Sequence, residues 1–391
     1  MRFARAVART PDVRLLGVVH TPPGGPDASL YHDLVRVTEP LSLRDILDGV
    51  EVLRRRHGQP YRIVGILEAL MVQLAQARVH FGVPGTRPEV AELFRDKSRM
   101  KDALRAAGLP VARSALVRTR SDAWAFAEAV GFPMVVKPPA GMGSKSTHRV
   151  HSLDELVRVA DAMGAGAHNP VLAEEFLRGR EYSFETLVTD GVPRVESASR
   201  YLPGCLEAVE NPWLQWCCLL PRDLSDPIFA RARDASRGAI AALGLDDGMT
   251  HMEWFERPDG SVVIGEIAQR PPGANISLMT GLAHDVDLYA AWARAVVDGV
   301  VDHLPWTRKY AVGSAFLRGA GRGRVAAVTG IHETWEAVGQ RVVEASLPTL
   351  GAPKSDSYEG DGYVVVRDPD TEVVKRDLKT IVDTIRVRYA D

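Results

Sequence analysis

Residues 250–270, THMEWFERPDGSVVIGEIAQR, carry the most informative pattern in the chain. Two apolar-rich stretches flank the turn sequence Pro-Asp-Gly at 258–260, and this order predicts a β-hairpin. Glu253 and Glu266 lie on opposite arms, where cross-strand pairing brings two carboxylates together. Facing carboxylates repel unless a cation lies between them, and magnesium accepts one or two carboxylates together with nucleotide phosphates. The hairpin therefore predicts a metal site, with unrelated surface acids as the alternative.

Arg270 follows the second of these acids by four residues. A guanidinium can form a two-pronged contact with a developing negative charge. We therefore expect Arg270 to be catalytic, meeting such a charge.

Residues 132–147, FPMVVKPPAGMGSKST, predict a short strand and a loop of small residues, and the alternation after them predicts a returning strand. Small residues let backbone N–H groups approach phosphate oxygens, and lysines add charge. The expected phosphate-binding residues of this flap are Lys137, Gly141, Gly143, Ser144 and Lys145. A Walker A loop is disfavoured, because Ser144 separates Gly143 from Lys145 and a strand follows where that motif needs a helix. A plain surface hairpin is the other alternative.

Residues 171–187, VLAEEFLRGREYSFETL, predict strands that carry several acids. An extended segment can offer backbone groups to an adenine edge, with an acid nearby to accept from ribose hydroxyls. Solvated acids on a strand are an alternative that this stretch alone leaves open.

Taken in order, these stretches resemble the ATP-grasp superfamily over residues 60–275. The segment 96–110, DKSRMKDALRAAGLP, is similar to the one that carries the family's first phosphate lysine, which implies this role for Lys97, and the flap implies Lys137 as the second. The remaining nucleotide contacts implied by the resemblance are Glu174 and Leu177 on adenine through backbone atoms, Glu175 in the pocket wall, and Glu181 on the ribose.

One position departs from the family pattern. The family usually has Asn two residues after the second metal glutamate, and here that residue is Ala268. One magnesium ligand is then missing, or is supplied by Asn275 or by water.

The resemblance implies a mixed α/β and α+β architecture with an ATP-grasp fold. We expect an N-terminal parallel α/β domain over 1–85, an ATP-grasp domain over 86–305 with a flap at 111–175, and a C-terminal α+β lobe over 306–391. The N-terminal stretch alternates helical and strand patterns, including a strand at 61–67, but RFARAVART predicts a helix where such units begin with a strand. We therefore expect an incomplete sheet in the first domain.

Within the superfamily, the hairpin and residues 312–330 look most like the L-amino-acid ligase group of carboxylate-amine ligases. This resemblance implies ATP-dependent formation of an acyl phosphate and then an amide bond, with release of ADP and phosphate and a need for Mg²⁺ or Mn²⁺. The expected partners are a small carboxylate and an amine, with amino acids as the expected substrates; Arg200, His251 and Trp213 are candidates for substrate contacts. The alternatives are a carboxylase of the biotin-carboxylase or purine-pathway type and a catalytically impaired nucleotide-binding protein.

Composition narrows the partners further. The 48 Lys and Arg against 50 Asp and Glu give a formal net charge of -2, so no global basic field attracts nucleic acid or anionic lipid. The three cysteines, two of them adjacent, predict free thiols rather than a disulfide framework. With a charged N-terminus and no apolar run of bilayer length, we expect a cytoplasmic protein; a homodimer is left open.

Overall fold

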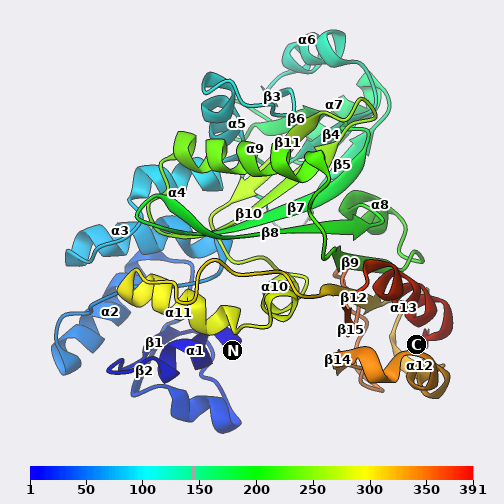
Figure 1. The fold of residues 1–391 in the computed structure, drawn as a ribbon. Helices are drawn as coiled ribbons and strands as arrows, with labels where there is room; N and C mark the ends of the chain where they lie inside the picture. Colours follow the sequence, from blue (N-terminus) through cyan, green and yellow to red (C-terminus); the bar gives the residue numbers. More distant parts are fainter. Residues whose placement is uncertain (142–145, 391) are drawn as a thin grey trace.

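The computed structural model describes residues 1–141 and 146–390, and an eight-stranded sheet forms its centre (Figure 1). The strand order in this sheet is β11-β10-β7-β8-β9-β12-β15-β14. Its strands are β7 (Arg180–Thr189), β8 (Val192–Leu202), β9 (Trp216–Leu220), β10 (Gly248–Glu256), β11 (Val262–Ala268), β12 (Ala311–Leu317), β14 (Val342–Ser346) and β15 (Gly362–Asp368). The predicted hairpin at 250–270 is present as β10 and β11.

The N-terminal region contains α1 (Arg2–Arg9), β1 (Leu16–Val19), β2 (Asp33–Arg36), α2 (Leu43–His57) and α3 (Met71–Phe81), with 3-10 turns at Gly25–Leu30 and Glu68–Leu70. Its sheet consists of β1 and β2 in parallel, and residues 2–9 are helical as predicted. The strand predicted at 61–67 is wrong, because this segment is irregular. Val64 and Ile66 bury their side chains against the apolar cluster that contains Trp292, and this burial needs no backbone pairing.

A separate four-stranded sheet, ordered β3-β6-β4-β5, forms the flap. Its elements are β3 (Ser114–Val117), α6 (Arg120–Val130), β4 (Met134–Lys137), β5 (His148–Val150), α7 (Leu153–Ala162) and β6 (Val171–Glu175), preceded by α4 (Pro88–Arg95) and α5 (Lys97–Ala106). The strand pattern that starts at residue 171 predicts one run of antiparallel sheet, whereas β6 lies in the flap sheet and β7 in the central sheet. Gly179 has a φ of +157°, and a Cβ there would lie 2.1 Å from the Glu256 carbonyl oxygen, so the chain passes too closely for a side chain as it enters β7.

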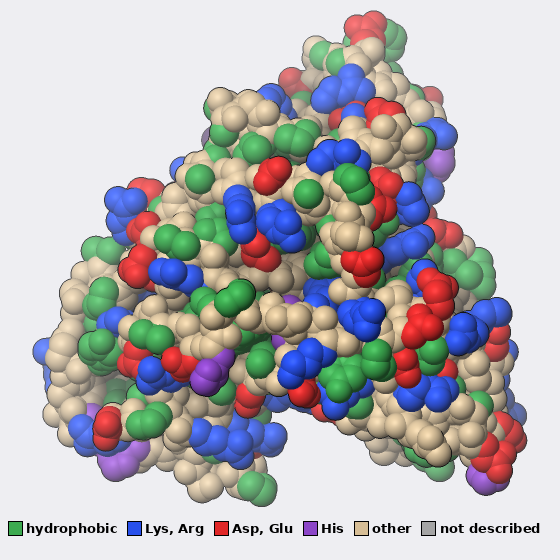
Figure 2. Space-filling view, viewed as in Figure 1, with side chains coloured by type: hydrophobic (Ala, Val, Ile, Leu, Met, Phe, Trp, Pro, Cys, Tyr) green, Lys and Arg blue, Asp and Glu red, His purple; other side chains and the backbone are tan. Residues whose placement is uncertain are grey.

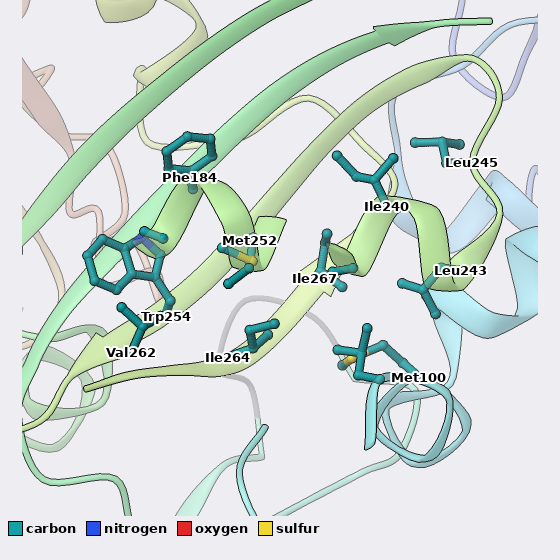
Figure 3. Close-up of a cluster of buried hydrophobic side chains, with 14 of the residues drawn as sticks. Met100, Phe184, Ile240, Leu243, Leu245, Met252, Trp254, Val262, Ile264 and Ile267 are labelled. Atoms are coloured by element: carbon teal, nitrogen blue, oxygen red, sulfur yellow. The ribbon is translucent and has the colours of Figure 1, made fainter. Parts of the chain in front are cut away.

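Helix α9 (Pro227–Leu243) lies over one face of the central sheet (Figure 1). Figure 3 shows the apolar contact between them, in which Met252, Trp254 and Ile264 from the hairpin meet Ile240 and Leu243 from α9. Because side chains alternate along a strand, residues between these apolar ones project from the other face. The core on the α9 side therefore directs the acids of the hairpin to the opposite side.

The remaining elements complete the opposite face and the C-terminal lobe. They are α8 (Cys205–Glu210), α10 (Ile276–His284), α11 (Leu288–Asp298), β13 (Arg324–Thr329), α12 (Ile331–Val338), a 3-10 turn at Gly339–Arg341, α13 (Thr371–Thr384) and β16 (Arg386–Ala390). The sequence pattern at 373–389 predicts one last helix, whereas α13 ends at Thr384 and β16 pairs with β13. Val387 and Tyr389 alternate into the apolar core of this lobe, which favours a strand.

Other global expectations concern thiols, surface charge and membrane segments. All three cysteines are free and buried. Figure 2 shows acidic and basic side chains interspersed on the viewed face. In the part of the chain that the structure describes, no helix has the length and apolarity needed to cross a membrane.

Candidate active site

Glu253 and Glu266 lie directly opposite each other on β10 and β11, as the sequence predicts. The neighbouring pair in the ladder is Trp254 of β10 with Ile264 of β11, so Gly265 is an extra residue in β11. Such a bulge removes a residue from the regular ladder. The Gly265 carbonyl instead accepts a hydrogen bond of 2.6 Å from Lys101 Nζ, and this contact ties α5 to the hairpin.

Three lysines and two glutamates form a buried cluster beside this pair. The lysine–carboxylate cluster consists of Lys97, Lys101, Lys137, Glu174 and Glu266. Lys97 Nζ lies 2.8 Å from Glu266 Oε1. Lys137 Nζ lies 3.0 Å from Glu174 Oε2 and 3.7 Å from Glu266 Oε2. Lys101 Nζ lies 3.2 Å from Glu174 Oε1, so the cluster has one more ammonium than carboxylate.

The charges of the cluster reinforce one another. Burial alone would lower the pKa of Lys137, but the Glu174 and Glu266 charges raise it above its ordinary value. Burial opposes ionisation of Glu266, whereas Lys97 and Lys137 lower its pKa to about 2. For Lys101 burial is the larger effect and lowers the pKa, although Glu174 opposes it. Lys101 and Lys137 also lower the pKa of Glu174, against the effect of burial. The charges thus favour ionised glutamates beside a cationic Lys137.

Glu181 lies apart from the lysines, near the start of β7. Its Oε2 accepts a hydrogen bond of 2.8 Å from the Cys205 backbone N–H, and a Cβ at Gly204 would approach the same oxygen to 2.5 Å. Burial, together with the charge of Glu253, raises the pKa of Glu181 to about 8. Lys137 and the Cys205 N–H oppose this effect without cancelling it, so Glu181 and Glu253 form an acidic site that suits a metal or a hydroxyl ligand.

Arg270 lies at the end of the hairpin and is held by an acid from the N-terminal region. Its Nε donates to Glu68 Oε2 at 3.0 Å, and Arg95 Nη1 lies 3.3 Å from Glu68 Oε1. Burial opposes the charge of Arg270, but Glu68 raises its pKa above the ordinary value, and Glu253 adds to this effect. The guanidinium is therefore charged and lies within the electrostatic reach of the acidic pair.

The flap loop packs onto the start of α5. Lys97 donates its backbone N–H to the Pro139 carbonyl at 2.9 Å and its Nζ to the Gly141 carbonyl at 2.8 Å. Arg95 donates to the Ala140 carbonyl. The other expected flap residues, Gly143, Ser144 and Lys145, lie outside the described residues.

The segment expected to contact adenosine shows side-chain roles that the resemblance did not imply. The Glu174 carboxylate belongs to the lysine–carboxylate cluster. Glu175 accepts from the Arg113 backbone N–H at 2.9 Å and lies 3.2 Å from Arg257. Leu177 is half-buried in the loop between β6 and β7.

The three weak substrate candidates lie in different places. Arg200 pairs with Tyr182, whose ring stacks on Trp254 of the α9-side core, so Arg200 is on the face opposite the acids. Trp213 is 63% exposed. His251 lies on the acidic face, with Nδ1 2.9 Å from Glu185 Oε1.

The donor set fits magnesium bound jointly with a nucleotide. Among residues 1–141 and 146–390, no three His, Cys, Asp or Glu side chains come together as a complete metal site. Two carboxylates are enough when phosphates and waters supply the other oxygens. Ala268 is buried opposite His251. Asn275 donates to Ser314 on β12 at 3.4 Å, and β7, β8 and β9 separate β12 from β10 in the sheet, so Asn275 does not join the pair.

Sequence reasoning missed Lys101 and Glu68. The sequence did contain a signal for Lys101. Residues four apart lie on one face of a helix, so Lys101 was expected beside Lys97, which was already assigned to phosphate. Glu68 had none, since its contact with Arg270 joins residues 202 positions apart.

Comparison with known proteins agrees with this geometry. Residues 102–276 match the model of the ATP-grasp domain. The L-arginine-specific L-amino acid ligase of Bacillus subtilis is 29% identical over 232 residues, which cover 58% of this chain. The chain spans about half, 55%, of that relative's length.

Solved structures show the same fold. The L-amino acid ligase from Bacillus licheniformis superposes with a TM-score of 0.80 at 18% identity, over 97% of this chain and 99% of that one. N5-carboxyaminoimidazole ribonucleotide synthetase from Thermotoga maritima gives a TM-score of 0.72 at 17% identity, over 100% and 96% of the two chains. Residues 102–276 therefore form an ATP-grasp domain, and the chain has the fold of solved ATP-grasp ligases.

Proposed function

We propose that this ATP-grasp ligase uses ATP to convert a carboxylate into an acyl phosphate and then joins it to an amine, releasing ADP and phosphate. The observation that carries the proposal is the lysine–carboxylate cluster, which adjoins the opposed acids Glu253 and Glu266. Surplus ammonium groups suit a polyphosphate, and an acidic pair within reach of them suits the metal that accompanies it. The likeness to an amino acid ligase supports amino acids as substrates.

Of the three proposed domains, 1–85, 86–305 and 306–391, the second supplies the nucleotide and metal contacts, and the first supplies Glu68, which holds Arg270. Lys97, Lys137 and the loop at Gly141 are the proposed phosphate contacts, together with Gly143, Ser144 and Lys145. Glu174, Glu175 and Leu177 are proposed for the adenine end and Glu181 for the ribose. Lys97 and Lys137 now contact Glu266, so we expect these contacts to loosen when phosphate oxygens arrive.

Magnesium or manganese, held by Glu253 and Glu266, would neutralise phosphate charge when bound. The lysines then hold the phosphoryl group in line with the attacking carboxylate oxygen, so positioning lowers the barrier. In the second step the amine nitrogen attacks the acyl carbon, and its carbonyl oxygen gains negative charge. Arg270 is the group proposed to donate to this oxygen, after which the C–O bond to phosphate breaks.

The test is a screen of amino-acid pairs for phosphate release, with products identified by mass and ADP and AMP assayed in parallel. The proposal expects ADP, phosphate and an amide. AMP and pyrophosphate would instead indicate adenylation and contradict the acyl phosphate. Phosphate release that depends on bicarbonate would favour the carboxylase alternative. Tight ATP binding without turnover by any pair would favour the impaired nucleotide-binding protein.

A further inference from the structure

A turn of the C-terminal lobe, residues 355–361 just before β15, carries a glutamate that the proposed mechanism does not use. We call this segment the Glu359 turn. Ser357 holds its shape, because the Ser357 hydroxyl accepts from the Glu359 N–H at 3.1 Å and the Ser357 carbonyl accepts from the Gly360 N–H at 3.0 Å. Gly360 has a φ of +72°, and a Cβ there would lie 2.5 Å from the Leu317 carbonyl oxygen. The turn is thus packed closely against the end of β12.

Glu359 reaches the segment that follows Arg270. Its carboxylate accepts from the Ala274 backbone N–H. A Cβ at Gly273 would lie 3.6 Å from Glu359 Oε1. Arg270 lies only three residues before Gly273, and its charge acts on Glu359. The C-terminal lobe therefore places a carboxylate close to the group that is proposed to serve the acyl intermediate.

Tyr358, the residue before Glu359, lies in the same region. Its ring meets the buried Trp216 of β9 edge-on, with 4.9 Å between the ring centroids. Burial raises the pKa of Tyr358, the charge of Glu253 adds to this effect, and the charge of Arg270 opposes it. Tyr358 is therefore within the electrostatic reach of both groups, and the Glu359 turn borders the candidate active site.

The Glu359 carboxylate lacks a cationic partner. No Lys, Arg or His side chain among the described residues forms an ion pair with it. Burial raises the pKa of Glu359, and the Ala274 N–H and the charge of Arg270 oppose this effect only in part. The residue is half-buried and so stays open to a ligand. A cation beside Glu359 would stabilise its charged form.

Arg270 and Glu359 have opposite charges and suit opposite ligands. Arg270 attracts the negative charge of an acyl phosphate or of the oxyanion formed from it. Glu359 repels such anions, and its remaining lone pairs can accept from an ammonium group. An aliphatic amine is a cation at neutral pH. The two side chains can therefore sort the two substrates, the carboxylate toward Arg270 and the amine toward the C-terminal lobe.

We propose that Glu359 binds the amine substrate, through a charge-assisted hydrogen bond from the ammonium group of the amine to the Glu359 carboxylate. This role rests on the proposed ligase function, and it assigns the amine to a residue of the C-terminal lobe. Glu359 has no part in binding the nucleotide or in forming the acyl phosphate. Its loss should therefore affect only the second step, and only for amines that carry a charge.

The test compares two classes of amine, with the full chain, ATP and magnesium. Hydroxylamine is uncharged at neutral pH and traps an acyl phosphate as a hydroxamate. Amino-acid amides carry an ammonium group but no carboxylate that could be activated. The common amino acids are offered as the carboxylate, and the release of ADP and the hydroxamate and amide products are measured. The acid that gives the most hydroxamate is then paired with the amide to which it couples fastest.

Variants locate the contact. Glu359→Gln should raise the KM for the amide at least about 10-fold, because it removes a charge-assisted contact. The KM values for ATP and the carboxylate, and the rate of hydroxamate formation, should change little. Glu372→Gln, whose side chain is 64% exposed on α13, is the matched control. If Glu359→Gln fails to fold, Glu359→Asp keeps the charge on a shorter side chain and should raise the same KM selectively but less.

The two amines also separate the possible failures. An unchanged KM for the amide in Glu359→Gln overturns this role. Equal losses with hydroxylamine and the amide also overturn it, because Glu359 would then only support the segment that carries Arg270. Hydroxamate formation without coupling to any amide shows that no cationic amine is bound. In these cases the acyl phosphate still forms, whereas a wild type that gives neither ADP nor hydroxamate with any acid contradicts the proposed function itself, and the role of Glu359 with it.

Discussion

Lys137 Nζ lies 3.0 Å from Glu174 Oε2, and this ion pair joins β4 to β6 inside the flap sheet. Both residues were expected to contact the nucleotide, but in different ways. Lys137 was expected to bind phosphate through its side chain, and Glu174 was expected to contact adenine through its backbone. The pair shows that the Glu174 side chain also fixes the lysine. Ammonium groups that are already held in place lose less side-chain entropy when a phosphate binds.

Lys137→Ala should weaken ATP binding about 10-fold or more. The change removes a charge-assisted contact worth about 1.5 to 3 kcal/mol, and it leaves Glu174 and Glu266 with one cation fewer. Calorimetry with ATP and magnesium measures the effect. Lys379→Ala, whose side chain is 77% exposed on α13, is the matched control. Unchanged ATP affinity in Lys137→Ala would count against a phosphate role.

Glu266→Gln should reduce turnover far more than ATP affinity, by roughly 100-fold or more. A metal contributes several kcal/mol where phosphoryl charge is redistributed in the transition state, and Ala268 leaves the site dependent on two acids. Added magnesium should rescue the variant only in part. Steady-state release of phosphate is compared with ATP binding, and Glu336→Gln on exposed α12 is the control. Equal losses in affinity and turnover would contradict the metal role.

His284 should make the fold sensitive to acid. Burial, together with the charge of Arg308, lowers the pKa of His284 to about 4 from 6.5. Because the folded-state pKa is below the unfolded one, this contribution is present above about pH 6.5 and is lost as pH falls toward 4. The shift corresponds to about 3 kcal/mol as an upper value.

Urea unfolding at pH 7.5 and 4.5 tests this effect by comparing wild type with His284→Gln. The free energy of unfolding of the wild type should fall more than that of the variant over this interval. His332→Gln changes a histidine that is 83% exposed and should follow the wild type. An identical acid dependence of His284→Gln and wild type would show that His284 does not titrate in this way.

The sequence was most informative where a functional arrangement depends on residues that are close together in the chain. The turn at 258–260 predicted the hairpin with Glu253 and Glu266 on opposite arms, and the bulge at Gly265 brings the two acids directly opposite each other. The strand expected at 61–67 failed because alternation reports burial and not backbone pairing, and Val64 and Ile66 are partly buried without a partner strand.

The parts that the sequence could not predict depend on contacts between distant segments. β6 joins the flap sheet by pairing with β3 and β4, and no periodicity reveals which strands will be its partners. The Glu68 contact with Arg270 is likewise a product of the fold. Roles at Gly143, Ser144 and Lys145 stay predictions, since these residues lie outside the described part of the chain.

Glu68 should act as a positioning residue for Arg270. Glu68→Gln keeps a similar shape but removes the charge that holds the guanidinium at 3.0 Å. Turnover should fall about 10-fold or more, since small displacements of a catalytic group are costly. The affinity for ATP should change little, because Arg270 is proposed to serve the acyl intermediate. Arg270→Ala should lose more turnover while the nucleotide and metal still bind.

The double variant separates positioning from an independent role. If Glu68 acts through Arg270, adding Glu68→Gln to Arg270→Ala should reduce turnover little further, because the interaction is already gone. Arg95→Met is the control, since Arg95 also contacts Glu68 but is assigned no catalytic part. The measurement is the rate of ADP and phosphate release, and the ATP affinity is recorded for each variant. If the two losses multiply in the double variant, Glu68 has a separate function and the positioning role is wrong.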